Sequence, residues 1–261
     1  MANEELRAGI TLSPFWWKAG PRPKIETGEL PQKVDILIIG SGFTGLSAAL
    51  TLARAGREVL IVERESAGWG ASSRNQGHVG AGLKRGLSAL SQTFGKPQAV
   101  RVFREAQAAV EFCKTLIEKE GINCRLEKRG RVQLAWSPAH YEMLAEEIRQ
   151  RVALTSLEAD LLTREEVQSQ VVSDQYYGGV LMHREATLHG ALFHLGLLKR
   201  VEQGGVTVQV DTEVRRIEGA TPAFTVVTSR GKVNARNVVV ATNGYTDRST
   251  LALCRRVVPL R

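Results

Sequence analysis

The chain has 261 residues, of which 43% are hydrophobic and 24% charged, a composition typical of a globular protein with one large or two modest domains. No apolar run approaches the roughly 20 residues of a membrane-spanning helix. Acids stand in the first ten residues where a secretory signal has bases, so we expect a cytoplasmic protein. The net charge of +8 is spread along the sequence, which disfavours a nucleic-acid partner. The three cysteines form no C-x-x-C pair and the five histidines are scattered, which disfavours a disulfide framework and a metal site.

The first 32 residues contain three prolines and the adjacent pair Trp16 and Trp17. The prolines predict an extended N-terminal leader. Because two neighbouring indoles are poor residues to leave in water, we expect them to pack on the body of the protein.

The next stretch, from Val34 to Glu63, has the pattern of a complete βαβ unit. Residues 35–39 predict a buried strand, and residues 58–62 predict a second strand that ends at Glu63. Between them, apolar residues recur at helical spacing up to Gly56. The first strand leads directly into a G-x-G-x-x-G turn, which consists of Gly40, Ser41, Gly42, Phe43, Thr44 and Gly45.

Each part of this turn has a chemical reason. Gly40 permits the tight turn, Gly42 lets the backbone approach a pyrophosphate, and Gly45 lets the helix lie close to the strand. The free amides at the start of the helix then bind the phosphates. Glu63 lies near the offset of about 20 residues at which an acid binds the adenosine ribose, and its charge disfavours the 2′-phosphate of NADP. The unit therefore predicts a dinucleotide site.

Residues 64–78 are rich in glycine, alanine and serine and follow neither the helical nor the strand period, so we expect a loop that a ligand approaches closely. Further along, the sequence predicts helices over residues 98–120, from Pro138 onward, from a capping box at 163–166, and over 187–203. Strands are predicted over 131–136, 178–182, 206–210, 213–217, 224–228 and 238–240. The run Val238 to Val240 is continuously apolar, as in a strand buried on both faces. We expect this strand to end in the residues Ala241 to Gly244.

The βαβ unit, the loop WGASSRNQG at 69–77 and the strand end VVVATNGY at 238–245 together resemble the FAD-dependent amine and amino-acid oxidases of the D-amino-acid oxidase superfamily. This family includes the gamma-glutamylputrescine, glycine and sarcosine oxidases. The resemblance implies an α/β fold, with a Rossmann-like FAD-binding domain at 33–95 and 155–250. An inserted, incomplete antiparallel α+β substrate domain would comprise 96–154 and 251–261.

The resemblance also implies a set of residues that contact FAD. The glycine turn would hold the pyrophosphate, Glu63 the ribose, Val214 the adenine, and the loop would pass the flavin ring, with Gln76 and His78 as candidate catalytic residues. The implied cofactor-binding residues are Gly40, Ser41, Gly42, Phe43, Thr44, Gly45, Glu63, Arg64, Gly70, Ala71, Ser72, Arg74, Asn75, Gln76, Gly77, Val214, Ala241, Thr242 and Gly244.

The implied activity is oxidation of the C–N bond of a small amine or amino acid, with oxygen as the electron acceptor. Family members continue beyond the position of Arg261, so the chain resembles their N-terminal portion, and a second polypeptide could complete it. Two alternatives stay open: an FAD-binding subunit inactive without a partner, and a tRNA-modifying FAD oxidoreductase. The small-residue loop after Glu63 and the strand end at 238–244 argue against a third, an NAD-dependent dehydrogenase.

Overall fold

The structure is a computed structural model that describes residues 13–257, and these divide into two units. The first consists of the described residues up to Gln76 together with those from His189 onward, and the second is Gly77–Leu188. The sequence-based domain boundaries differ from this division, since they assign 77–95 and 155–188 to the first domain and 251–261 to the second. Residues 258–261, the end of the stretch that the sequence assigns to the second domain, lie outside the described part. Within residues 13–257, no helix is both long and apolar enough to cross a membrane.

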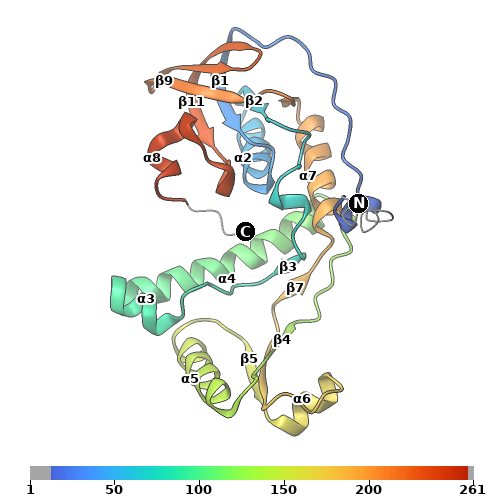
Figure 1. Cartoon of the computed structure of the whole chain (residues 1–261), viewed down its shortest axis with the longest axis vertical. Helices are drawn as coiled ribbons and strands as arrows, with labels where there is room; N and C mark the ends of the chain where they lie inside the picture. Colours follow the sequence, from blue (N-terminus) through green and yellow to red (C-terminus); the bar gives the residue numbers. More distant parts are fainter. Residues whose placement is uncertain (1–12, 258–261) are drawn as a thin grey trace, which may run out of the picture. The chain divides into compact units, whose positions relative to one another are not determined.

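The first unit is built on a six-stranded mixed sheet (Figure 1) with the order β8-β2-β1-β11-β10-β9. The strands β8, β2, β1 and β11 run parallel to one another, whereas β11, β10 and β9 are antiparallel. Their bounds are β1 Lys33–Ile39, β2 Val59–Val62, β8 Thr207–Gln209, β9 Val214–Ala220, β10 Ala223–Thr228 and β11 Gly231–Val240. The predicted βαβ unit and the four later strands are therefore confirmed. Their ends agree within three residues, except that β11 begins at Gly231, seven residues before the predicted run at 238–240.

Strand β1 is buried on both faces, as its sequence predicts. Ile38 lies toward the helix α2, Phe43–Arg54. A Cβ built on Gly45 of that helix would stand 3.4 Å from Cγ2 of Ile38. Alternation places Leu37 and Ile39 on the other face, where they join a cluster of valines from β2, β9, β10 and β11. The second helix of this unit, α7 Gly190–Gln203, packs against α2.

Two sequence-based expectations for this unit are wrong. Val238 to Val240 are only half buried, because β10 pairs with β11 over residues 231–235 alone and β1 is the one described neighbour beyond that point. The helix predicted from Thr187 begins instead at Gly190. Thr187 belongs to the short strand β7, Ala186–Thr187, and the ring of His189 caps α7 by accepting from Leu192 N at 3.3 Å.

The N-terminal segment packs on the first unit, as predicted for its tryptophans. A 3₁₀ turn, η1 Phe15–Lys18, places the Trp16 ring edge-on to His189, with ring centroids 4.9 Å apart. The indole Nε1 of Trp17 donates a hydrogen bond to Ser73 Oγ at 2.7 Å.

The second unit combines a three-stranded antiparallel sheet, β4-β6-β5, with a set of helices. The predicted helix starts are confirmed: Ser137 caps α5 by accepting from His140 N, and the capping box at Thr163 opens α6. Helix α5 packs on β6 through Leu144 and Ile148. The elements are β3 His78–Val79, α3 Leu87–Phe94, α4 Lys96–Lys119, β4 Arg131–Leu134, α5 Pro138–Leu154, β5 Ala159–Leu162, α6 Arg164–Gln170, β6 Gly179–Met182 and β7.

These contacts explain why residues 77–95 and 155–188 group with the second unit. Strands β5 and β6 complete the sheet that β4 begins, and α3 packs against α4 and α5. Residues 251–257, which the sequence assigns to the substrate domain, instead follow the first unit and contain the helix α8, Leu251–Cys254.

Candidate nucleotide-binding site

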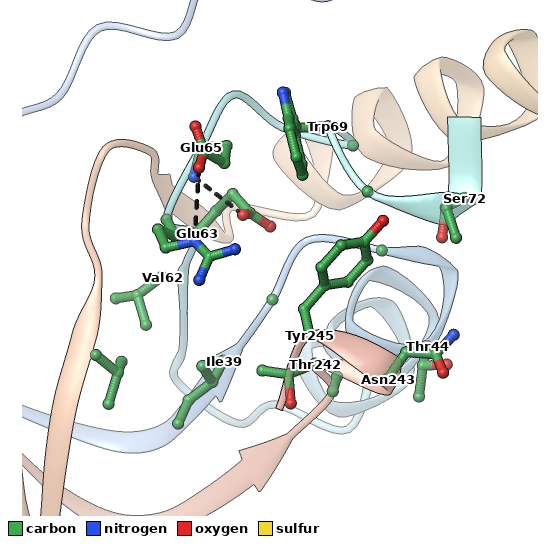
Figure 2. A pocket seen from close by; sticks show the side chains of 18 of the residues that line it. Ile39, Thr44, Val62, Glu63, Glu65, Trp69, Ser72, Thr242, Asn243 and Tyr245 are labelled. Carbon is green, nitrogen blue, oxygen red and sulfur yellow. Dashed lines mark hydrogen bonds and ion pairs between the residues drawn. The ribbon is translucent and has the colours of Figure 1, made fainter. Parts of the chain in front are cut away.

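A cleft that is partly open to solvent lies at the carboxyl ends of β1, β2 and β11. This is the edge at which open α/β sheets bind ligands. The predicted binding residues that line it are Gly40, Gly42, Phe43, Thr44, Glu63, Arg64, Gly70, Ala71, Ser72, Val214, Ala241 and Thr242. The structure thus brings together lining residues from 39–72, 212–214 and 241–249, which are far apart in the sequence (Figure 2).

The three glycines of the turn have three different surroundings. Gly40 has φ of +101°, and a Cβ there would lie 2.8 Å from the carbonyl oxygen of Ala241. At Gly45 a Cβ would lie only 2.0 Å from the carbonyl oxygen of Gly40, so helix and turn can pack this closely only without a side chain. At Gly42 a Cβ would meet a single group, Ser72 Oγ at 3.0 Å. Gly40 and Gly45 therefore serve the fold, whereas Gly42 keeps the entrance to the helix open.

The amino end of α2 faces the cleft. Gly42 is its N-cap residue and offers no side chain to the helix amides, while Gly42, Phe43 and Thr44 all line the cleft. The amide of Phe43 donates to Ser72 Oγ at 3.0 Å. Because a helix amino end carries partial positive charge and unpaired amides, this surface suits an anionic group such as a diphosphate.

Glu63, at the end of β2, presents a carboxylate with capacity for one more donor. Its Oε2 accepts from Ser41 N at 2.9 Å and from Ser41 Oγ at 2.8 Å. Its Oε1 accepts from Glu65 N at 3.1 Å. A carboxylate has about four acceptor positions, so one remains on Oε1. A ribose hydroxyl is the kind of donor that this position suits.

An aromatic pair forms part of the cleft wall. The rings of Trp69 and Tyr245 meet edge-on, with centroids 6.0 Å apart, and Tyr245 covers Gly70, where a Cβ would lie 3.1 Å from its Cε2. Figure 2 shows both rings among the side chains that line the cleft. The sequence-based prediction included neither as a site residue, although Trp69 is the first residue of the loop at 69–77 and Tyr245 is the last residue of the strand end at 238–245.

The remaining cofactor-binding predictions do not line the cleft. Ser41 and Gly45 lie behind it, Asn75 bonds the Ala71 and Ser72 carbonyls from within the loop, and Gln76 is exposed. Arg74 and Gly244 likewise do not line it. Gly77 belongs to the second unit, where a Cβ would stand 1.8 Å from the carbonyl oxygen of Leu188. The cleft is also lined by residues that no sequence pattern indicated, among them Thr212, Glu213, Asp247 and Ser249.

His78, the second candidate catalytic residue, lies in the second unit beside a buried acid. Its Nε2 is 2.7 Å from Glu185 Oε2, and Arg131 Nη1 is 3.5 Å from the same oxygen. The side chain of Glu185 is only 4% exposed. Gly80 makes room for the pair, because a Cβ there would lie 2.5 Å from His78 Nε2 and 2.7 Å from Glu185 Cδ. A carboxylate accepts only, so it holds the proton on Nε2 and leaves Nδ1 of a neutral ring as an acceptor.

Comparison with known proteins shows the family. Residues 35–261 match the family described as "FAD dependent oxidoreductase", and the chain belongs to it. Gamma-glutamylputrescine oxidoreductase of Escherichia coli is 29% identical over 226 residues, which are 86% of this chain and 53% of that protein. The chain thus spans about half the length of this relative.

Solved structures share the fold. Glycine oxidase of Geobacillus kaustophilus gives a TM-score of 0.69 at 21% identity, over 86% of this chain and 59% of that one. L-alpha-glycerophosphate oxidase of Mycoplasma pneumoniae, solved with FAD bound, gives a TM-score of 0.64 at 16% identity, over 80% and 53% of the two chains. The predicted family, α/β fold class and FAD cofactor are therefore confirmed.

Proposed function

We propose that the cleft holds the ADP half of FAD and that the chain forms the FAD-binding portion of an amine or amino-acid oxidoreductase. The diphosphate would lie against the amino end of α2, formed by Gly42, Phe43 and Thr44, and the ribose against Glu63 Oε1. Val214 would border the adenine. The observation that carries the proposal is the pairing of a helix amino end, whose N-cap residue Gly42 has no side chain, with a carboxylate that retains one acceptor position.

The described residues fit this cofactor better than a phosphorylated dinucleotide. The cleft offers an anion surface at α2 and, at the end of β2, the carboxylates of Glu63 and Glu65. A ribose 2′-phosphate at that end would meet two negative charges, with Arg64 already 3.5 Å from Glu65 Oε1. FAD has free hydroxyls there, which donate to a carboxylate.

FAD, when bound, supplies two-electron oxidation of the carbon that bears the nitrogen. The protein's part is to orient the amine, favour its neutral form and exclude water. For these tasks we propose Gln76 and His78 as the residues nearest the substrate. Glu185 fixes the proton of His78 on Nε2, so that Nδ1 can accept a hydrogen bond or proton from the amine. The relatives' printed names support a substrate with an amine nitrogen, such as a gamma-glutamylated diamine, glycine or another amino acid.

Titration of the purified chain with FAD, followed by flavin fluorescence and absorbance, tests the cofactor site. Glu63→Gln should weaken FAD binding between about ten- and hundredfold, because hydrogen bonds to charged groups contribute about 1.5–3 kcal/mol. Glu58→Gln, an exposed acid just before β2, is the matched control and should bind as the wild type does. A wild-type chain that folds but binds no FAD would contradict the proposal.

A second assay addresses the reaction. The FAD-loaded chain is offered diamines, gamma-glutamylated amines, glycine, sarcosine and D-amino acids, and peroxide release is measured. Peroxide with one class identifies the substrate and oxygen as the acceptor. Binding of FAD without peroxide identifies a chain that needs further polypeptide for turnover, in line with its span of 53% of the E. coli relative.

A further inference from the structure

We propose that the N-terminal segment, defined here as residues 14–22, is a positioning element of the nucleotide site. It would hold Ser41, Glu63 and Trp69 in the arrangement that binds the cofactor. The segment precedes residue 35, where the family match begins. The inference rests on the proposed function, since it assigns the segment to the same cleft.

The first support is a series of hydrogen bonds that leads from Trp17 to Glu63. Trp17 Nε1 donates to Ser73 Oγ at 2.7 Å, and Ser73 Oγ donates to the carbonyl oxygen of Gly68 at 2.6 Å. The amide of Gly68 donates to Ser41 Oγ at 3.1 Å, and Ser41 Oγ donates to Glu63 Oε2 at 2.8 Å.

The direction of this series is fixed by chemistry. An indole N–H can only donate and a carboxylate can only accept, so each serine hydroxyl between them accepts from one side and donates to the other. Ser41 and Ser73 are fully buried, and water cannot replace a lost partner without rearrangement. Removing the donor at Trp17 therefore leaves the Ser73 hydroxyl with one hydrogen bond fewer, so that it fixes the loop that passes over Ser41 less firmly.

The second support also ends at Ser41, through a buried histidine. Arg22 Nη1 is 3.0 Å from His194 Nδ1, and His194 Nε2 is 2.7 Å from the carbonyl oxygen of Ser41. Because arginine only donates, Nδ1 must accept and Nε2 must donate to the carbonyl. Burial lowers the pKa of His194 to about 4, the Ser41 hydrogen bond opposes this shift, and Arg22 adds to it. The ring is thus neutral, and the tautomer that binds Ser41 is the one Arg22 selects.

The third support is the wall of the cleft itself. The guanidinium carbon of Arg74 lies 4.9 Å from the Trp17 ring and 4.2 Å from the Trp69 ring. The cation therefore stands between an indole of the N-terminal segment and an indole that lines the cleft. All three contacts end on groups of the proposed cofactor site, which simple packing of a leader would not require.

The test removes individual hydrogen-bond donors of the segment and measures FAD binding. Trp17→Phe keeps an aromatic ring but lacks the N–H donor, and we expect about tenfold weaker FAD binding from a lost buried hydrogen bond. Arg22→Lys keeps the charge but cannot bond both His194 and the neighbouring carbonyls, and we expect a similar loss. Phe15→Leu is the control, because Phe15 is in the same turn and 71% exposed. Circular dichroism and melting of the apoprotein establish that each variant is folded.

A double-variant cycle separates positioning from general stability. In a Ser41→Ala background the series is already interrupted, so Trp17→Phe should weaken FAD binding less than twofold further. Equal losses in both backgrounds, or wild-type affinity in both Trp17→Phe and Arg22→Lys, would overturn the inference while leaving the cofactor site in place. Failure of the wild-type chain to bind FAD would instead overturn the proposed function.

Discussion

The two units build their candidate sites in different ways. In the first unit the anion surface is backbone, the amides at the start of α2, and its position depends on glycines that lie within six residues of one another. In the second unit the candidate group is a side chain, His78, and its partner Glu185 is 107 positions away in the sequence. A binding surface made of backbone amides therefore has a short, recognisable pattern in the sequence, whereas a pair of side chains depends on contacts between residues that are far apart in the sequence.

The two units also differ in what surrounds their glycines. A Cβ on Gly45 would collide with the backbone of Gly40, whereas a Cβ on Gly80 would collide with the ends of two side chains. Backbone in a packed turn cannot move without moving the elements on both sides, but side-chain ends can change rotamer. We therefore expect substitutions in the first unit to affect the whole fold and those in the second to affect one contact.

The largest expected effect is at Gly45. Gly45→Ala should lower the free energy of unfolding by about 3 kcal/mol, the upper range for overpacking, because its Cβ would stand 2.0 Å from the carbonyl oxygen of Gly40. Gly42→Ala is the matched substitution, since its Cβ would meet only Ser72 Oγ and should cost well under 1 kcal/mol. Urea unfolding of the apoprotein measures both. Equal losses at the two glycines would show that the turn is not packed as described.

This contrast explains how much the sequence could predict. The βαβ unit, the caps at Ser137 and Thr163 and the cleft residues on the glycine turn follow from local spacing, and the structure has them in place. Glu185 could not be found, because nothing near it in the sequence indicates that β7 brings it to His78.

The position of Val238 to Val240 could not be predicted either, because their burial depends on which strand pairs beside β11. Asp247 and Ser249 reach the cleft from a short 3₁₀ turn, η4 Arg248–Thr250. Such a turn has no apolar period, so its approach to the site carries no local signature.

The second prediction compares a buried histidine with an exposed one. Burial lowers the pKa of His194 from 6.5 to about 4, so the folded state binds this proton more weakly than the unfolded state. The resulting stability is fully present above pH 6.5 and is lost as the pH falls toward 4, by about 3 kcal/mol in all.

In urea unfolding at pH 7, 5.5 and 4.5, the wild type should lose more stability on acidification than His194→Gln. His183→Gln is the control, since His183 is exposed and paired with Asp160 at 2.7 Å, and it should follow the wild type. Parallel curves for the wild type and His194→Gln would mean that His194 binds its proton as strongly in the folded state as in the unfolded state.

The smallest expected effect is at Gly80, in the second unit. Gly80→Ala should cost about 1 kcal/mol, because its Cβ would stand 2.5 Å from His78 Nε2 and the ring must turn away from Glu185. Gly82→Ala is the control, since nothing lies within 4 Å of a Cβ there.

Nitrogen-15 chemical shifts of the His78 ring then show which nitrogen carries the proton. With Glu185 as its acceptor, Nε2 should be protonated in the wild type and in Gly82→Ala, and both tautomers should be populated in Gly80→Ala. A wild-type ring protonated on Nδ1 alone would show that Glu185 does not orient His78. The two units would then still differ in how their glycines are packed, but the second unit would no longer contain an oriented histidine–carboxylate pair.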